Sequence, residues 1–356
     1  MSQLGGDIKP GIDCPSHATF VDGALWVEQH PETPEVDMDS DVAKARPYKA
    51  FCIFEEASGS ASHWRHLQHA TKKVDGVPTS SLIVRAVTAV GNYDYITEFK
   101  FGLDGSIRVN FDFAGYMETR WFSQKTTPWE RSLGEIVHQN VAAPFHSHFG
   151  CFKVDLDSPT GKGESLETTR ITAGMKSDVP ILRGWATKYV ERNYATKEGV
   201  GLSTFVPSAA TPTGFAIVDG VGSSALDDAT PTAPPGYMIV PGPTVAQTLP
   251  DDHPFVLASA FSKYTLAVTK RKEEERRATA VYDLFGPGEP YTSLDSFLDG
   301  ESIEQTDLVA WVSLGKEHVP RTEDLPLISN FGTYFDLIPR NIHSVNAAMD
   351  VYVGED

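Results

Sequence analysis

The sequence has little of three things, and each scarcity excludes a class of protein. No apolar run approaches the roughly 20 residues that a membrane-spanning helix needs. Three cysteines among 356 residues are too few for a scaffold built on disulfides. Basic residues are outnumbered, 30 Lys and Arg against 48 Asp and Glu, for a net charge of -18. Such a charge repels nucleic acid and anionic membrane surfaces, so we expect neither as a partner.

The two ends of the sequence carry no targeting signal. Residues 1–6 have neither the basic region nor the apolar core of a signal peptide. Residues 352–356 match no peroxisomal or retention signal. The compartment therefore stays open between an extracellular and a peroxisomal location, and the Gly-rich start predicts that the chain begins inside a domain.

The hydrophobic periodicity is mostly that of β-strands. Residues 81–101 form a long run rich in Val, Ile, Thr, Tyr and Phe, and the Gly-Leu-Asp-Gly at 102–105 turns it into residues 107–111. This pattern predicts a β-hairpin. Residues 144–157 and 307–314 are further strand-like runs.

Pro- and Gly-rich loops separate these strands, and no internal repeat or linker interrupts them. Only residues 273–277 have the composition of a helix, and a charged hairpin tip explains them equally well. We therefore expect one all-β domain over residues 1–356, built as a large antiparallel β-sandwich.

His146 and His148 are the first candidate metal ligands. Residues two apart on a strand project from the same face, so both imidazoles can reach one ion. The alternative is a polar strand face that happens to hold two histidines. His318 is the candidate third ligand, although alone it reads as a loop histidine, and three imidazoles with an open position suit copper or zinc.

A second histidine pattern occurs at His63, His66 and His69. On a helix, histidines at this spacing would lie partly on one face and would suggest a zinc cluster. The surrounding residues lack helix caps, so a polar surface segment is the favoured interpretation.

Five segments, in this order along the chain, resemble the copper-containing primary-amine oxidases (the topaquinone family), and in particular the animal, vascular-adhesion-type branch. The resemblance covers nearly the whole sequence and implies the C-terminal part of that family's catalytic domain. The segments are residues 11–22, 90–95 (VGNYDY), 143–148 with 152–157 (APFHSH and FKVDLD), 266–275, and 308–312 with 318–324.

The resemblance implies a role for each residue at the centre of these motifs. Tyr93 matches the tyrosine that becomes the quinone cofactor, and His146, His148 and His318 match its three copper ligands. Copper(II) can polarise a bound phenolate toward oxygen, which a redox-inert zinc ion cannot do. Asn92 matches the residue that restrains the quinone.

Asp94 fits a position where the family has Asp or Glu. The sequence departs from the family pattern nearby, because Ala89 stands three residues before Asn92 where a Thr is common, and Thr88 lies one place earlier.

The resemblance also implies secondary sites. Five ligands match a peripheral calcium site of hard oxygen donors, with solvated acidic strand ends as the alternative: Asp155, Leu156 (carbonyl), Asp157, Asp307 and Leu308 (carbonyl). Asp299 and Glu301 are candidates for a second such site. Cys14 and Cys52 match the family's disulfide pair, and Cys151 is expected to face away from the copper as a buried free thiol.

The implied activity converts a primary amine, dioxygen and water into aldehyde, ammonia and hydrogen peroxide. The family's catalytic-base Asp belongs upstream of the position of Cys14, and neither Asp7 nor Asp13 matches its motif. We therefore expect impaired amine turnover in this chain, with a catalytically inactive copper-binding relative in binding or adhesion as the alternative. A plain all-β binding module is a third reading. The resemblance further implies a homodimer that exchanges hairpin arms, for which residues 270–275 are a candidate.

Overall fold

The computed structural model describes most of the chain, in two compact units. Described are residues 7–27, 44–121, 123, 127, 132–157, 161–175, 186–206, 214–220, 233–279 and 292–348. Unit 1 comprises Met1–His148, Lys316–Tyr334 and Ala347–Asp356, and unit 2 comprises Phe149–Gly315 and Phe335–Asn346. Three strands begin in one unit and continue in the other: β9 (His146–Asp155), β17 (Leu308–His318) and β18 (Ile328–Arg340).

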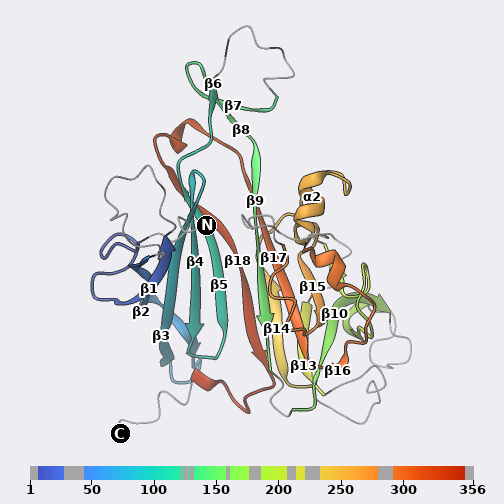
Figure 1. The fold of residues 1–356 in the computed structure, drawn as a ribbon. Helices are drawn as coiled ribbons and strands as arrows, with labels where there is room; N and C mark the ends of the chain where they lie inside the picture. The colour runs from blue at the N-terminus through green and yellow to red at the C-terminus, as the bar shows by residue number, and fades with distance from the viewer. Residues whose placement is uncertain are drawn as a thin grey trace. The chain divides into compact units, whose positions relative to one another are not determined.

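Unit 1 is built on a sheet in which neighbours along the chain are neighbours in space (Figure 1). Its order is β1 (Thr19–Val27), β2 (Lys44–Leu67), β3 (Val74–Val90), β4 (Tyr93–Gly102) and β5 (Ile107–Gly115), followed by the first part of β18. The pairings from β1 to β5 are antiparallel. A separate small sheet joins β6 (Arg120–Trp121), β8 (Val141–Pro144) and β7 (Gly134–His138).

The run at residues 81–101 contains a turn that the sequence analysis did not place. The chain reverses at Gly91 and Asn92, so the run is the end of β3 and most of β4. Gly91 has φ +62°, a backbone conformation that Gly adopts without strain. The hairpin expected at residues 102–105 is confirmed, and it joins β4 to β5.

Residues 8–14 pack against strands β2 and β3 of this sheet. Ile8 and Cys14 pack with Cys52, Phe54 and Ile83 in a buried cluster. Cys14 and Cys52 form a disulfide across 38 residues of sequence. The cross-link therefore fixes the N-terminal segment to the middle of β2.

Unit 2 contains two antiparallel sheets. The first has the order β18, β14 (Gly236–Pro241), β13 (Gly214–Asp219), β10 (Glu164–Met175) and β11 (Ala186–Tyr194), and β16 (Glu304–Thr306) also pairs with β10. The second has the order β12 (Thr204–Phe205), β15 (Leu266–Lys270), β17 and β9. Ring contacts between Phe205 and Phe215, and between Phe152 and Phe335, join residues of the two sheets. The expected all-β fold with large antiparallel sheets is confirmed.

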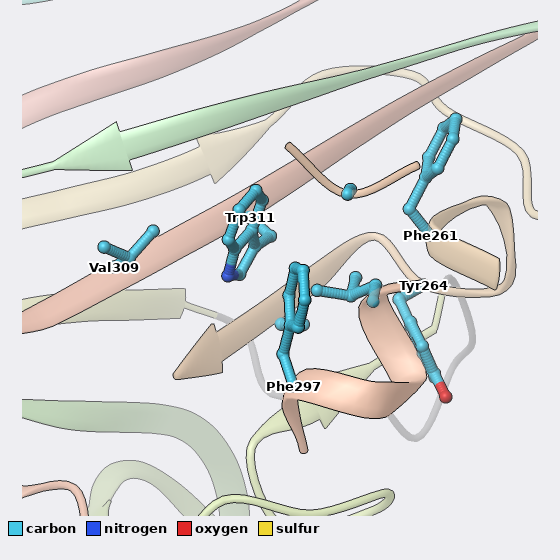
Figure 2. Packing of buried hydrophobic residues seen from close by; sticks show 8 residues of the cluster. Phe261, Tyr264, Phe297, Val309 and Trp311 are labelled. Atoms are coloured by element: carbon cyan, nitrogen blue, oxygen red, sulfur yellow. The ribbon is translucent and has the colours of Figure 1, made fainter. Parts of the chain in front are cut away.

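Short helical turns cover the second sheet of unit 2, and Figure 2 shows the core between them. Trp311 of β17 is 1% exposed, its ring lies 5.5 Å from that of Phe297, and its indole N–H donates to Thr269 at 3.0 Å. Within the described residues, the helical elements of this unit are α2 (Pro254–Ala258), η3 (Ala260–Lys263) and η4 (Leu294–Phe297), and that of unit 1 is η5 (Thr322–Asp324). Residues 308–315 of β17 are buried on both faces, which explains their nearly continuous apolar run.

Residues 273–277 form bends and irregular chain rather than a helix. Among the residues that the structure describes, no helix is long and apolar enough to cross a membrane.

Removal of the disulfide tests the stability of unit 1. Replacing Cys14 and Cys52 by Ser should lower the free energy of unfolding by about 4 kcal/mol, the chain-entropy value for a loop of this length. Urea denaturation followed by circular dichroism measures the change. Cys151→Ser is the control, because Cys151 is a free thiol and its replacement removes no cross-link. A double variant as stable as the wild type would contradict the prediction.

Candidate metal centre

Three histidines distant in sequence meet within unit 1. His146 and His148 lie at the start of β9, and His318 is the last residue of β17. One ring nitrogen from each lies within 4.8 Å of the other two. The ring centroids of His146 and His148, and those of His146 and His318, are 4.9 Å apart. The structure thus brings together the three histidines that the sequence singled out, and places His318 on a strand rather than in a loop.

Tyr93 is held against these three imidazoles. It is the first residue of β4 and is 5% exposed. Its hydroxyl oxygen lies 2.8 Å from Nε2 of His146 and 3.0 Å from Nδ1 of His318. The ring of His148 packs edge-on against the Tyr93 ring at 4.4 Å.

Hydrogen bonds on the far side of two imidazoles determine where their protons lie. Nδ1 of His146 lies 2.9 Å from the carbonyl oxygen of Pro144, and Nε2 of His318 lies 3.3 Å from a carboxylate oxygen of Asp324. Both oxygens accept hydrogen bonds, so those two nitrogens carry the protons. The other nitrogens present lone pairs to the Tyr93 hydroxyl, which has one proton to donate. One lone pair is therefore left uncompensated, as a cation site requires.

His148 supplies a second uncompensated nitrogen. Its Nε2 is buried and has no hydrogen-bond partner among the residues that the structure describes. Burial lowers the pKa of His148 to about 3, and the nearby His146 and His318 act in the same direction, so the ring is neutral. The ring stacks on Phe113 at 4.6 Å. A neutral, buried imidazole with an unpartnered nitrogen is the state in which histidine binds metals.

Asp324 is the residue at this centre whose role the sequence analysis missed. It is 3% exposed, and it accepts hydrogen bonds from the backbone N–H of Arg321 at 3.0 Å and from its guanidinium at 3.2 Å. Burial alone would raise the pKa of Asp324, but the hydrogen bonds from Arg321 and His318 lower it below its ordinary value. Asp324 is therefore a carboxylate, which is the form that orients His318.

The environment of Tyr93 disfavours its charged form. Burial raises the pKa of the phenol, and the charge of Glu118 adds to the increase, while a hydrogen bond from the Glu118 backbone opposes it. Tyr93 is thus neutral unless a nearby cation stabilises its phenolate.

The other two motif residues lie beside Tyr93 in the backbone. Asn92 is exposed in the β3–β4 turn, and its carbonyl accepts from the backbone N–H of Tyr116 at 2.8 Å. Asp94 lies in β4 between Ala89 and Ala114 of the neighbouring strands. Gly115 has φ +105°, and a Cβ there would meet the Asn92 oxygen at 2.6 Å, so this close approach requires Gly.

Unit 2 holds a cluster of carboxylates. Oxygen atoms of Glu198, Asp299 and Glu301 lie within 4.8 Å of one another. Glu198 is 1% exposed, and burial raises its pKa to about 7. The ammonium of Lys272 lies 2.7 Å from Asp299 and 3.3 Å from Glu301. Asp299 and Glu301 were predicted from the sequence, but Glu198 was not, because no motif surrounds it.

The ligands expected for the peripheral calcium site are less closely grouped. Within the described residues, Asp155, Asp157 and Asp307 do not form a group of the closeness seen in the other two clusters. Arg271 instead lies 2.7 Å from Asp155 and 3.7 Å from Asp307. Burial, followed by repulsion from Asp155, raises the pKa of Asp307. Leu156 and Leu308 neighbour these residues in the chain, and this site stays a prediction.

The structure also describes Cys151 and part of the histidine-rich segment at residues 63–69. Cys151 is a free thiol, and burial of its sulfur raises its pKa to about 12. The segment at 63–69 is not helical, since β2 extends to Leu67, and His66 and His69 are exposed at its end. The side chain of His63 lies outside the described residues.

Comparison with known proteins adds to this geometry. The family model described as copper amine oxidase, enzyme domain, matches residues 1–355. The amine oxidase [copper-containing] 3 of Bos taurus is 29% identical over 361 residues, covering 99% of this chain and 44% of the relative. The peroxisomal amine oxidase [copper-containing] alpha 2 of Arabidopsis thaliana is 29% identical, covering 98% and 49%. The chain thus spans about half the length, or less, of these relatives.

Solved structures show the same fold. The lysyl oxidase of Pichia pastoris matches with a TM-score of 0.77 and 25% identity, covering 98% of this chain and 44% of that structure. The Aspergillus nidulans amine oxidase matches with a TM-score of 0.79 and 22% identity over the same shares. With the family model matching nearly every residue, the chain belongs to the copper amine oxidase family and carries sequence of its enzyme domain.

Proposed function

We propose that His146, His148 and His318 bind copper and that Tyr93 is the precursor of topaquinone. The observation that carries this proposal is the position of the Tyr93 hydroxyl, 2.8 and 3.0 Å from unprotonated nitrogens of two of the histidines. Copper bound there would supply the Lewis acidity and one-electron chemistry needed to oxidise the phenol with dioxygen.

The hydrogen bonds of the histidines indicate which atoms bind the metal. Pro144 holds the proton of His146 on Nδ1, and Asp324 holds that of His318 on Nε2. The free donors are therefore Nε2 of His146 and Nδ1 of His318, and the unpartnered Nε2 of His148 completes the set. Because three neutral imidazoles do not cancel the positive charge of the ion, that charge would stabilise the phenolate of Tyr93.

The residues around Tyr93 orient the ring and exclude water. Tyr93 is buried, and His148 packs against one side of it. By resemblance to the family, Asn92, which precedes Tyr93, restrains the quinone. Asp94, which follows Tyr93, occupies the position where the family has Asp or Glu.

We infer that the whole protein oxidises primary amines with dioxygen to aldehyde, ammonia and hydrogen peroxide. Family membership supports this activity, and the chain spans less than half of the animal relatives. A general base typically contributes about 10²–10⁴-fold to such a step. Since neither Asp7 nor Asp13 matches the motif of the family's base, residues 1–356 alone should form the quinone but turn over amines slowly.

We also propose that residues 1–356 act as one catalytic domain within a homodimer. Trp121, Ile136 and Phe145 are 75%, 49% and 43% exposed on or beside the small sheet of β6, β7 and β8. Exposed apolar side chains of this size favour burial against another protein surface where they adjoin one another. Residues 270–275, the region first considered for an exchanged arm, instead contact Asp155 and Asp299 within unit 2.

Calcium is the hard cation that the carboxylates of unit 2 would bind. Two sites are proposed: Glu198 with Asp299 and Glu301, and Asp155 with Asp157, Asp307 and the carbonyls of Leu156 and Leu308. At the first, the Lys272 ammonium takes the position of a cation, so calcium would compete with it.

Replacing Tyr93 by Phe tests the quinone. Wild-type chain loaded with Cu²⁺ in air should turn pink and stain with a carbonyl reagent. Tyr93→Phe should bind copper, because the three imidazoles remain, and should stay colourless. Tyr116→Phe, at an exposed tyrosine, is the control that keeps the colour. A copper-bound but colourless wild type would favour the inactive, copper-binding relative.

Replacing Asp324 by Ala tests the orientation of His318. The variant leaves the Nε2–H of His318 buried without an acceptor and should weaken Cu²⁺ binding by about 10–100-fold. Competition with a chelator measures the affinity. Arg321→Met is the matched control, because it removes the ion pair to Asp324 and leaves the Asp324–His318 contact. Equal losses in both variants would contradict the prediction.

Calcium titration tests the carboxylate cluster of unit 2. Isothermal calorimetry should show binding that Glu198→Gln weakens by at least about tenfold, since a neutral amide is a poorer ligand for Ca²⁺. Lys272→Met should tighten the same binding by removing the competing cation. Calcium affinity that is unaltered in both variants would exclude this cluster as the site.

A further inference from the structure

We infer that Tyr95 is a positioning residue for the metal centre: its hydroxyl oxygen accepts a hydrogen bond from Nδ1–H of His148 and so keeps Nε2 of His148 free to bind copper. This inference rests on the proposed copper site. It assigns a role to the second tyrosine of the residue 92–95 motif, which the resemblance left without one.

The geometry places Tyr95 directly behind His148. Tyr95 follows Tyr93 by two residues on β4, so both side chains point to the same face of the sheet. The Tyr95 hydroxyl lies 3.1 Å from Nδ1 of His148. The Tyr93 ring lies 4.4 Å from the His148 ring, so the two tyrosines contact the same imidazole.

Aromatic packing holds the Tyr95 ring in place independently of its hydroxyl. The ring stacks on Phe111 at 5.7 Å and meets Phe113 edge-on at 5.4 Å. Phe113 also stacks on His148 at 4.6 Å. One buried ring therefore aligns both partners of the hydrogen bond, and removal of the hydroxyl alone leaves this packing unchanged.

The proton of His148 has two possible positions. With the proton on Nε2, a buried N–H would have no acceptor, because Nε2 has no hydrogen-bond partner within the described part of the chain. With the proton on Nδ1, the N–H donates to Tyr95, and the bare lone pair of Nε2 lies among the ligand nitrogens of His146 and His318. Each arrangement leaves Nε2 without a protein partner, but a bound cation satisfies a bare lone pair and repels an N–H, so metal binding favours the second arrangement.

Tyr95 differs from the groups that orient the other two histidines. A carbonyl at Pro144 and a carboxylate at Asp324 only accept, so their partners have one possible tautomer. A phenol can donate or accept. His148 is therefore the ligand whose tautomer depends on the direction of one hydroxyl, and metal binding at Nε2 requires Tyr95 to accept.

The test uses the full 356-residue chain and the variant Tyr95→Phe. Cu²⁺ affinity, measured by chelator competition, should weaken by about 10–100-fold, the usual effect of losing an outer partner of a metal-bound histidine. The matched control is Tyr264→Phe, which removes a buried tyrosine hydroxyl hydrogen-bonded to Asp295 in unit 2. The control should bind Cu²⁺ as the wild type does.

A spectroscopic readout separates positioning from a general loss of structure. In ¹⁵N-histidine protein loaded with diamagnetic Zn²⁺, which takes the same imidazole ligands, wild type should show a slowly exchanging proton on Nδ1 of His148. Tyr95→Phe should lose this protection, and Tyr264→Phe should keep it. If Tyr95→Phe does not fold, the wild-type spectrum still decides, because attachment of His148 to zinc through Nδ1 would overturn the inference.

The outcomes distinguish this inference from the copper proposal. Wild type that binds neither Cu²⁺ nor Zn²⁺ would overturn both. Wild type that binds Cu²⁺, together with a Tyr95→Phe variant of equal affinity and equal Nδ1–H protection, would overturn only the role of Tyr95.

Discussion

The metal centre depends on an imbalance between lone pairs and protons in a buried space. Imidazole nitrogens of His146, His148 and His318 converge there, and the Tyr93 hydroxyl is the donor placed among them. A buried acceptor without a partner is destabilising, and burial also keeps His148 neutral. A cation would interact favourably with all three lone pairs at once. The arrangement of the three imidazoles therefore favours metal binding.

The β-structure of unit 1 makes this arrangement possible because it brings distant segments together at strand ends. Tyr93 begins β4, His146 begins β9, and His318 ends β17. The Tyr93–His318 contact spans 225 residues of sequence. Gly115 lets the strand beside Tyr93 approach the Asn92 carbonyl at a distance that any side chain would block. The position of the phenol is therefore set by backbone pairing, and the imidazoles are oriented by hydrogen bonds behind them.

The sequence could predict the features that depend on residues near one another in the chain, and not the contacts between distant segments. Strand alternation alone placed His146 and His148 on one face, and the 102–105 turn chemistry gave the β4–β5 hairpin. His318 needed the family resemblance, because no local rule joins it to β9. Glu198 was missed for the same reason, since its partners lie about a hundred residues away. The turn at Gly91 was hidden inside a continuous apolar pattern, because both flanking strands have the same alternation.

The two clusters differ in the charge they present, and this difference selects the metal that each can hold. Neutral imidazoles in unit 1 suit a borderline transition-metal ion, and the buried His148 has no counter-charge to offer a hard cation. The carboxylates around Glu198 in unit 2 are hard, anionic donors that already attract Lys272. Copper at the carboxylates would lose its preferred nitrogen ligands, and calcium at the histidines would lose its oxygen ligands. By ligand chemistry, the proposed site beside Tyr93 favours a redox ion, and the proposed carboxylate site favours a redox-inert one.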